Sequence, residues 1–245
     1  MWTKNSPFLW LKSVLLADFS LFLKYTSTFQ LGCFYVLYPF LLDLLSVKNI
    51  RNKAEDRVKS LMLGQSQNHH YHNLQHNESV ADAAVDLCDA MGIGESDTLE
   101  VILAAWFHDV GYTEGLENHE KRGCLHARVF LEEQKVREEY IRNVERLIVA
   151  TDINSKPSGV LELIIRDADL HYLGENKFEH FSSMLRKEWE LLQSEYYSEI
   201  QWLELNLSFL ENHAYFTPAA KAFYNGQKEK NIQQIKSRRA SLLLS

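Results

Sequence analysis

Apolar residues recur at spacings of three and four residues along most of this chain, and that periodicity restricts the fold more than any other feature. Val80, Ala84, Leu87 and Met91, for example, fall on one face of a helix. No segment shows strict alternation of apolar and polar residues between turn residues, which is the pattern of a β-strand. The sequence therefore predicts an all-α fold.

Turn and capping residues divide this pattern into separate helices. Gly92 and Gly94 end the helix that carries Val80, and Asp97 with Glu100 predicts a capping box that opens the next one. Thr217 followed by Pro218 predicts the start of the last helix. Between them, helices are expected over residues 119–134, 136–150 and 160–170, followed by a long amphipathic stretch over 177–210. Its aromatic series is expected to pack in a core or an interface: Trp189, Tyr196, Tyr197 and Trp202.

The first 50 residues are predicted to form an apolar N-terminal helical extension, and residues 51–245 the remaining domain. The run from Tyr25 to Leu42 carries no charge but is diluted by polar residues. Its length reaches the lower limit for a membrane span. A buried or dimer-forming helical hairpin, an interfacial helix and a true span all remain open. Without a secretory signal pattern, we expect a cytoplasmic protein, or one that associates with a membrane through residues 8–45, and a homodimer through these helices.

The charge balance limits the class of partner. With 26 Lys and Arg against 33 Asp and Glu, the formal net charge is −7. Proteins that bind nucleic acids carry a basic surface, so duplex binding is not expected.

Histidine and aspartate residues gather in short clusters within apolar helical context. Four members of these clusters form a mixed imidazole and carboxylate set: His76, His108, Asp109 and Asp169. Such ligands indicate a site for Mn, Mg, Co, Ni or Zn rather than a sulfur-rich structural zinc site. A buried aspartate directly after an apolar run needs a partner. Because Gly111 predicts a helix end, His108 and Asp109 can point the same way. The sequence predicts that these four residues hold one or two divalent ions.

The order of these residues resembles the H…HD…D signature of the HD superfamily of metal-dependent phosphohydrolases, with His76, His108–Asp109 and Asp169 at the matching positions. The block from Tyr71 to His76 is also similar to the opening motif of cyclic-nucleotide phosphodiesterases. Residues 185–188 and the tail from Phe216 to Ile232 resemble bacterial predicted HD phosphohydrolases. The resemblance covers roughly residues 58–236 and implies that residues 51–245 form an HD-type helical bundle.

The resemblance and the residue chemistry together suggest roles for individual side chains. In the phosphodiesterase motif His72 would protonate the leaving oxygen, and Asp109 would orient the attacking water or bridge to a second ion. Glu120 is a candidate for orienting a ligand histidine or His72, and His119 is a further candidate ligand for a second ion. Four residues are expected to contact the substrate or its phosphate: Asn73, Lys121, Arg122 and Arg166.

The resulting expectation is an enzyme that hydrolyses a phosphate ester in a nucleotide or related small phosphate, using water activated by a divalent metal. Three other functions stay open: a cyclic-nucleotide-type phosphodiesterase, a nucleotide-sensing HD module without turnover, and a di-iron HD oxygenase that would draw on His119 and His126.

Overall fold

The computed structural model describes residues 49–64 and 68–244. The chain divides between Lys48 and Asn49 into two units. Residues 1–48 of the predicted N-terminal extension lie outside the described residues, so the dimer-forming and membrane-binding roles of the extension stay predictions. Within the described part of the chain, no helix is both long and apolar enough to cross a membrane.

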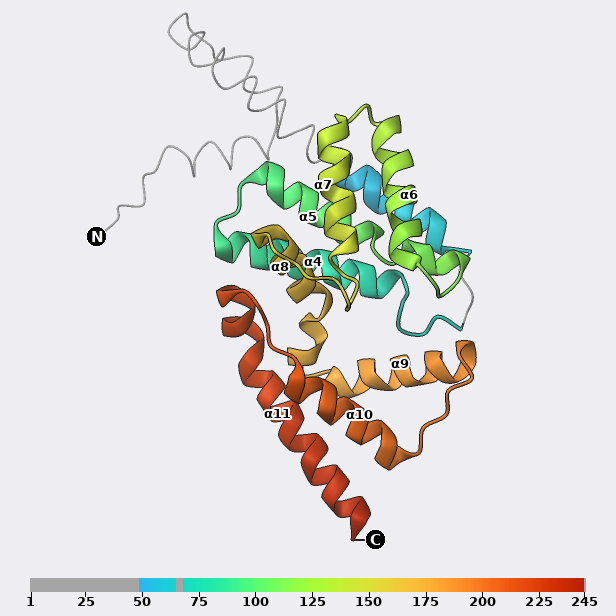
Figure 1. Ribbon diagram of the computed structural model, residues 1–245, viewed down its shortest axis with the longest axis vertical. Helices are drawn as coiled ribbons and strands as arrows, with labels where there is room; N and C mark the ends of the chain where they lie inside the picture. The colour runs from blue at the N-terminus through green and yellow to red at the C-terminus, as the bar shows by residue number, and fades with distance from the viewer. Residues whose placement is uncertain (1–48, 65–67, 245) are drawn as a thin grey trace, which may run out of the picture. The chain divides into compact units, whose positions relative to one another are not determined.

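The described residues form helices joined by turns, and none of them forms a strand, which confirms the predicted all-α class (Figure 1). Residues 49–62 are helical. The elements that follow are α4 (Leu74–Met91), α5 (Glu95–Phe107), the 3-10 helix η1 (Val110–Glu114), α6 (His119–Glu133), α7 (Glu138–Val149), α8 (Val160–Asp169), the 3-10 helix η2 (His171–Gly174), α9 (Phe178–Leu192), α10 (Glu199–Asn212) and α11 (Pro218–Leu243).

Helix α5 lies in the interior of this unit. Every residue from Leu99 to Phe107 is buried, which fits a segment that is apolar on nearly all sides. Helices α4, α7 and α8 pack directly on α5, and α6 packs on α7 and on α5 itself. Burying apolar side chains on several faces stabilises the fold. It also places the C-terminal end of α5, where His108 follows, among the ends of its neighbours.

Most predicted helix boundaries agree with the structure to within two residues. The Thr217 side chain accepts a hydrogen bond from the Ala220 N–H at 3.1 Å, and Pro218 is the first residue of α11, as the sequence predicts. The predicted capping box at Asp97 is wrong, because α5 already begins at Glu95 after Gly94, without a side-chain cap. Glu100 is buried instead, and its Oε1 accepts a hydrogen bond from Asn143 Nδ2 at 2.9 Å.

The amphipathic stretch over 177–210 is divided into α9 and α10. Ser194 adopts a positive φ of 56° in the connection. Ser198 and Gln201 then form a reciprocal capping box that starts α10. Helix α10 packs on α11, and α11 packs on η2 and α4.

Two buried polar contacts attach α11 to the segment around η2. Both carboxylate oxygens of Asp167 accept hydrogen bonds at the start of α11, from the Phe216 and Thr217 N–H groups at 2.8 Å and from the Thr217 hydroxyl at 2.7 Å. The Asn231 amide donates to the Leu173 and Glu175 carbonyls at 2.9 Å. Because a buried polar group needs its partners, these contacts fix the segment that directly follows Asp169.

Gly123 lets α6 approach the end of α5 closely, so Gly123→Ala should destabilise the fold. An added Cβ would lie 2.6 Å from the Phe107 carbonyl oxygen and 2.9 Å from that of His108. We expect the free energy of unfolding to fall by about 1–3 kcal/mol, as for an overpacked core. Urea denaturation measures this change.

Gly226→Ala in α11 provides the matched control, because no atom lies within 4 Å of its added Cβ. It should leave stability unchanged or raise it by up to about 1 kcal/mol, since alanine favours a helix over glycine. Equal effects at both positions would contradict the packing role of Gly123.

Candidate metal centre

The ends of three helices bring the predicted metal ligands together. His76 is in the first turn of α4, where the Asn73 side chain accepts a hydrogen bond from the His76 N–H at 3.2 Å. Helix α5 ends at Phe107, so His108 is its C-cap and Asp109 leaves the helical path at φ −101° and ψ 0°. Asp169 is the last residue of α8. The predicted helix end near Gly111 therefore allows His108 and Asp109 to face the same point.

The candidate ligand atoms converge closely. His76 Nε2 lies 3.4 Å from Asp109 Oδ2 and 3.3 Å from Asp169 Oδ1. His108 Nε2 lies 3.2 Å and 3.4 Å from the same two oxygens. The ligand atoms of His76, His108 and Asp169 all lie within 4.8 Å of one another, so this group could hold a metal ion. We name these three residues together with Asp109 the His–Asp cluster.

Two buried atoms of the His–Asp cluster have no hydrogen bond. They are His108 Nε2 and Asp109 Oδ2, although their residues are only 1% and 3% exposed. Such atoms are costly to bury without a partner. A divalent cation bound between the imidazole nitrogens and carboxylate oxygens would satisfy both, so the donor set fits the metal that the sequence predicts.

A backbone contact fixes the ring orientation of His108. His108 Nδ1 lies 2.8 Å from the Ala105 carbonyl oxygen. Because a carbonyl only accepts hydrogen bonds, Nδ1 must carry the proton, and in the neutral ring Nε2 then presents its lone pair to the cluster. His119 is held in the same way, with Nδ1 3.2 Å from the Leu116 carbonyl oxygen.

The charges in the cluster stabilise one another. Burial alone would raise the pKa of the Asp109 and Asp169 carboxyls, but the neighbouring imidazoles, His108 foremost, hold the pKa of both well below the ordinary range. Burial would lower the pKa of His108, yet the two carboxylates raise it well above its usual value. The carboxylates thus require positive charge beside them, which a protonated imidazole or a bound cation supplies.

A second group of donors lies on the other side of Asp109. His119 Nε2 is 3.8 Å from Asp109 Oδ1 and 3.2 Å from Glu120 Oε1. Asp109 therefore presents Oδ2 to His76 and His108 and Oδ1 to His119, an arrangement compatible with the predicted second ion. His126 instead contacts Glu114, so His119 and His126 do not point to a common site.

Glu188 is a functional candidate that the sequence reasoning missed. It belongs to α9, is 1% exposed, and its Oε2 accepts hydrogen bonds from the Tyr71 and His72 N–H groups at 2.8 and 3.0 Å. Its Oε1 contacts His72 Nδ1. Burial alone would lower the pKa of His72, but this hydrogen bond to Glu188 contributes to a net upward shift. One signal was available: Glu188 follows Phe181 and Leu185 at seven and three residues, on the same helical face.

Tyr112 joins the two histidines that lie beside the cluster. Its ring stacks on His72 at a centroid distance of 4.2 Å and on His119 at 3.9 Å. Tyr112 follows Gly111 in η1 and was not singled out from the sequence. Because both faces of its ring are covered by imidazoles, Tyr112 fixes the distance between His72 and the second donor group.

A cavity of about 570 Å³ opens onto the His–Asp cluster. Asp109, Asp169, His72, His119 and Glu120 lie in its wall. All three predicted catalytic residues, His72, Asp109 and Glu120, therefore face one space. The volume is typical of a small-molecule site.

The predicted substrate-binding residues do not line this cavity. Arg166 donates to the Ala150 and Ile153 carbonyls at 2.9 and 2.7 Å and thereby holds the loop that follows α7. Arg122 donates from Nε to the Gly111 carbonyl at 3.0 Å and so fixes η1. Asn73 caps α4, and Lys121 is exposed. In this structure, the two guanidinium groups and the amide bind the chain's own backbone rather than facing the cavity.

If the His–Asp cluster holds a divalent ion, His108→Ala should abolish the stabilisation that the ion provides. At a free Mn²⁺ concentration of 100 times its dissociation constant, the unfolding free energy of the unaltered protein should rise by about 2.7 kcal/mol. Thermal denaturation with and without Mn²⁺, together with calorimetric titration, measures this difference. His180→Ala serves as the control, because His180 is an exposed residue of α9. Unchanged Mn²⁺ binding in His108→Ala would refute the assignment.

Comparisons of this chain with protein-family models, with curated proteins and with solved structures gave no significant match. The resemblance of His76, His108–Asp109 and Asp169 to the HD signature therefore stays a prediction. Any statement about function depends on the chemistry of the His–Asp cluster and of the cavity that opens onto it.

Proposed function

We propose that this chain is a metal-dependent phosphohydrolase of the HD type, acting on a small phosphate ester. The observation that carries the proposal is the convergence of His76, His108, Asp109 and Asp169 at a cavity whose wall also holds His72. Paired imidazoles and carboxylates beside a space for a ligand suit hydrolysis that uses a metal ion. His108 Nε2 and Asp109 Oδ2 support the same proposal, because these buried atoms lie 3.2 Å apart and neither has a hydrogen bond.

A divalent ion in the His–Asp cluster would polarise a phosphoryl oxygen and lower the pKa of water. Asp109 faces His108 through Oδ2 and His119 through Oδ1, so its carboxylate is placed to accept a hydrogen bond from an attacking water. The buried carbonyl contact of His108 keeps its ring directed at the cluster. These residues hold and orient the reactants rather than form covalent bonds to them.

His72 is the candidate proton donor to the leaving oxygen. It lines the cavity, four residues before His76, and contacts Glu188 through Nδ1. A carboxylate that accepts a hydrogen bond from Nδ1 stabilises the imidazolium, which is the form in which His72 would donate a proton. Glu188 is therefore a positioning residue for His72, while Glu120 lies beside His119. The sequence suggested that Glu120 orients either a ligand histidine or His72, and in this proposal Glu188 orients His72 instead.

Hydrolysis itself is the direct test. Full-length protein loaded with Mn²⁺, Mg²⁺ or Co²⁺ should release inorganic phosphate from nucleoside monophosphates or simple alkyl and aryl phosphates, or convert a cyclic nucleotide to the nucleoside monophosphate. A chelator should abolish the hydrolysis. Asp169→Asn should lower the rate to background, because it removes a negatively charged candidate ligand. Nucleotide binding without turnover in any metal would instead indicate the sensing module. Two bound irons per chain would indicate the oxygenase.

The role of His72 predicts a dependence on the leaving group. For alkyl phosphates, His72→Asn should lower kcat by about 10²–10⁴, the usual contribution of a general acid. For aryl phosphates the loss should be much smaller, because a phenolate leaves without being protonated. Steady-state kinetics on both ester types measures the two losses.

Glu188→Gln should reproduce this leaving-group dependence to a smaller extent, because it keeps the shape of the side chain but removes the charge. Glu190→Gln is the matched control, since Glu190 belongs to the same helix and pairs with Arg186 instead. Equal losses of kcat on alkyl and aryl phosphates in His72→Asn would exclude proton donation by His72.

A further inference from the structure

The wall of the cavity at the His–Asp cluster has two chemically different parts. One part carries the imidazoles and carboxylates described above. The other part is formed by α9 and α10, which contribute Leu185, Trp189, Trp202, Leu205 and Phe209, and we name it the apolar end. A ligand that fills the cavity therefore meets both a polar, charged surface and an apolar, aromatic one.

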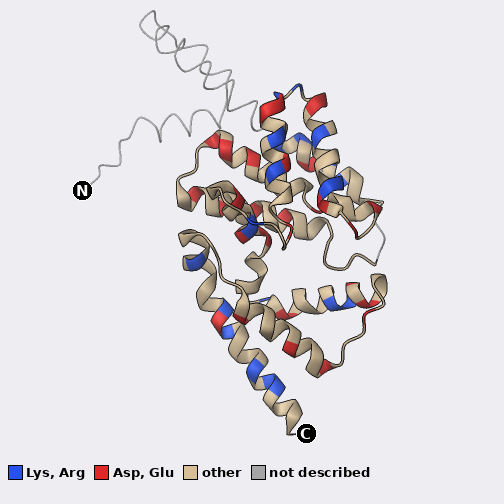
Figure 2. Cartoon of the chain, in the orientation of Figure 1, with Lys and Arg blue, Asp and Glu red and all other residues tan. Residues whose placement is uncertain are grey.

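Among the described residues that line the cavity there is no lysine or arginine. The charged side chains in its wall include four carboxylates, those of Asp109, Glu120, Asp152 and Asp169. Figure 2 shows lysine and arginine residues interspersed with acidic ones along α6 and α7. There Arg128, for example, pairs with Glu145 at 2.7 Å. Proteins that bind several phosphate groups normally use arginine or lysine to neutralise them, and the described part of this wall offers neither.

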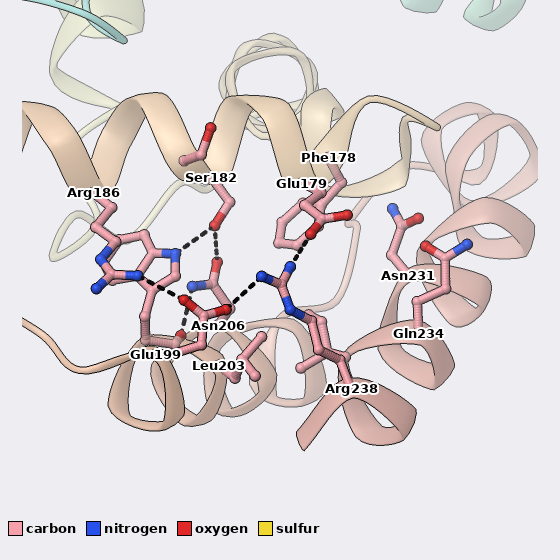
Figure 3. Close-up of a pocket in the computed structure, with 13 residues that line it drawn as sticks. Phe178, Glu179, Ser182, Arg186, Glu199, Leu203, Asn206, Asn231, Gln234 and Arg238 are labelled. Atoms are coloured by element: carbon pink, nitrogen blue, oxygen red, sulfur yellow. Dashed lines mark hydrogen bonds and ion pairs between the residues drawn. The ribbon is translucent and has the colours of Figure 1, made fainter. Parts of the chain in front are cut away.

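Two arginines of α9 and α11 are held in ion pairs with Glu199 of α10. Arg186 Nη1 lies 3.0 Å from Glu199 Oε2, and Arg238 Nη2 lies 2.7 Å from Glu199 Oε1. Figure 3 shows this network in a smaller cavity of about 170 Å³ between α9, α10 and α11. Arg186 also lies over the Trp202 ring, with its guanidinium carbon 5.9 Å from the ring centroid. Trp202 borders both cavities and so lies between Arg186 and the larger one.

The polar groups at the apolar end are largely engaged within the protein. Trp202 Nε1 donates to Ser182 Oγ at 2.9 Å, and that hydroxyl donates to Asn206 Oδ1 at 2.8 Å. The Asn206 amide in turn donates to the Trp202 carbonyl at 2.7 Å. The Trp189 and Trp202 rings meet edge to face with centroids 5.6 Å apart. This end therefore offers a surface for a planar or apolar group, with few hydrogen bonds to distinguish one such group from another.

From this arrangement we infer that the substrate carries a single phosphoryl group joined to an uncharged apolar or aromatic organic group. The inference rests on the proposed function, because a metal ion in the His–Asp cluster would provide the charge that one phosphoryl group needs. A polyphosphate chain would bring further negative charge among the four carboxylates, and none of the described lining residues is a lysine or arginine that could neutralise it, so that repulsion disfavours it. The apolar wall of α9 and α10 binds the organic group.

Two comparisons test the inference on full-length protein with Mn²⁺. Phenylpropyl phosphate and glycerol phosphate are both primary alkyl esters, so their leaving groups are similar, and kcat/KM should be about tenfold or more higher for phenylpropyl phosphate. A nucleoside monophosphate should bind about tenfold or more tightly than the triphosphate of the same nucleoside. Quenching of tryptophan fluorescence measures the affinities, because Trp189 and Trp202 line the cavity.

Matched substitutions assign the preference to the cavity wall. Trp189→Ala should reduce kcat/KM for phenylpropyl phosphate much more than for glycerol phosphate, while Tyr196→Ala, at a residue that is 77% exposed, should change neither. Leu205→Arg adds a cation to the wall and should narrow the difference in affinity between triphosphate and monophosphate. Leu191→Arg, at an exposed position of α9 that does not line the cavity, should leave that difference unchanged.

The outcomes separate this inference from the proposed function. Hydrolysis of phosphate esters without either preference would overturn the inference and leave the phosphohydrolase proposal intact. If no ester is hydrolysed but phenylpropyl phosphate quenches fluorescence more strongly than glycerol phosphate does, the ligand class holds and hydrolysis is excluded. Absence of both hydrolysis and quenching overturns both.

Discussion

One buried and one half-buried carboxylate, placed against two buried imidazoles, are the constraint on which the rest of this structure depends. Asp109 and Asp169 lie within 3.4 Å of His76 and His108. Removing such charges from water is expensive unless opposite charge accompanies them. The charged residues must therefore lie together. The N-terminal end of α4 and the C-terminal ends of α5 and α8 meet at this point and bring them there.

The packing around α5 holds this point in place. Because α5 is buried along its second half, its C-terminal end cannot move without disturbing α4, α7 and α8. Gly123 brings α6 against the carbonyl groups of Phe107 and His108. Arg122 fixes η1 by binding the Gly111 carbonyl, and Arg166 fixes the loop after α7 by binding the Ala150 carbonyl. The same guanidinium groups are consequently absent from the described wall of the cavity, and so the packing of the fold determines the charge of the site.

The sequence anticipated the ligands of the candidate metal centre better than the groups around it. His76, His108, Asp109 and Asp169 were recognisable as a set, because imidazoles and carboxylates follow one another in the order of the HD signature and each interrupts an apolar helical context. Glu188 and Tyr112 were missed. Glu188 reads as an ordinary charge in an amphipathic helix, and Tyr112 as a loop residue. Trp189 and Trp202, which the sequence placed in a core or an interface, form part of the cavity wall.

By itself the sequence determined the all-α class, most helix boundaries and the residue types of the His–Asp cluster, because helical periodicity, caps and helix ends are local properties of the chain. Only the tertiary structure decided which carboxylate contacts His72 and which cations reach the cavity. Glu188 is 116 residues from His72 in the chain, and Arg166 is engaged by carbonyl groups 13 and 16 residues before it. Such pairings arise from the packing of helices against one another, which no single segment of the sequence specifies.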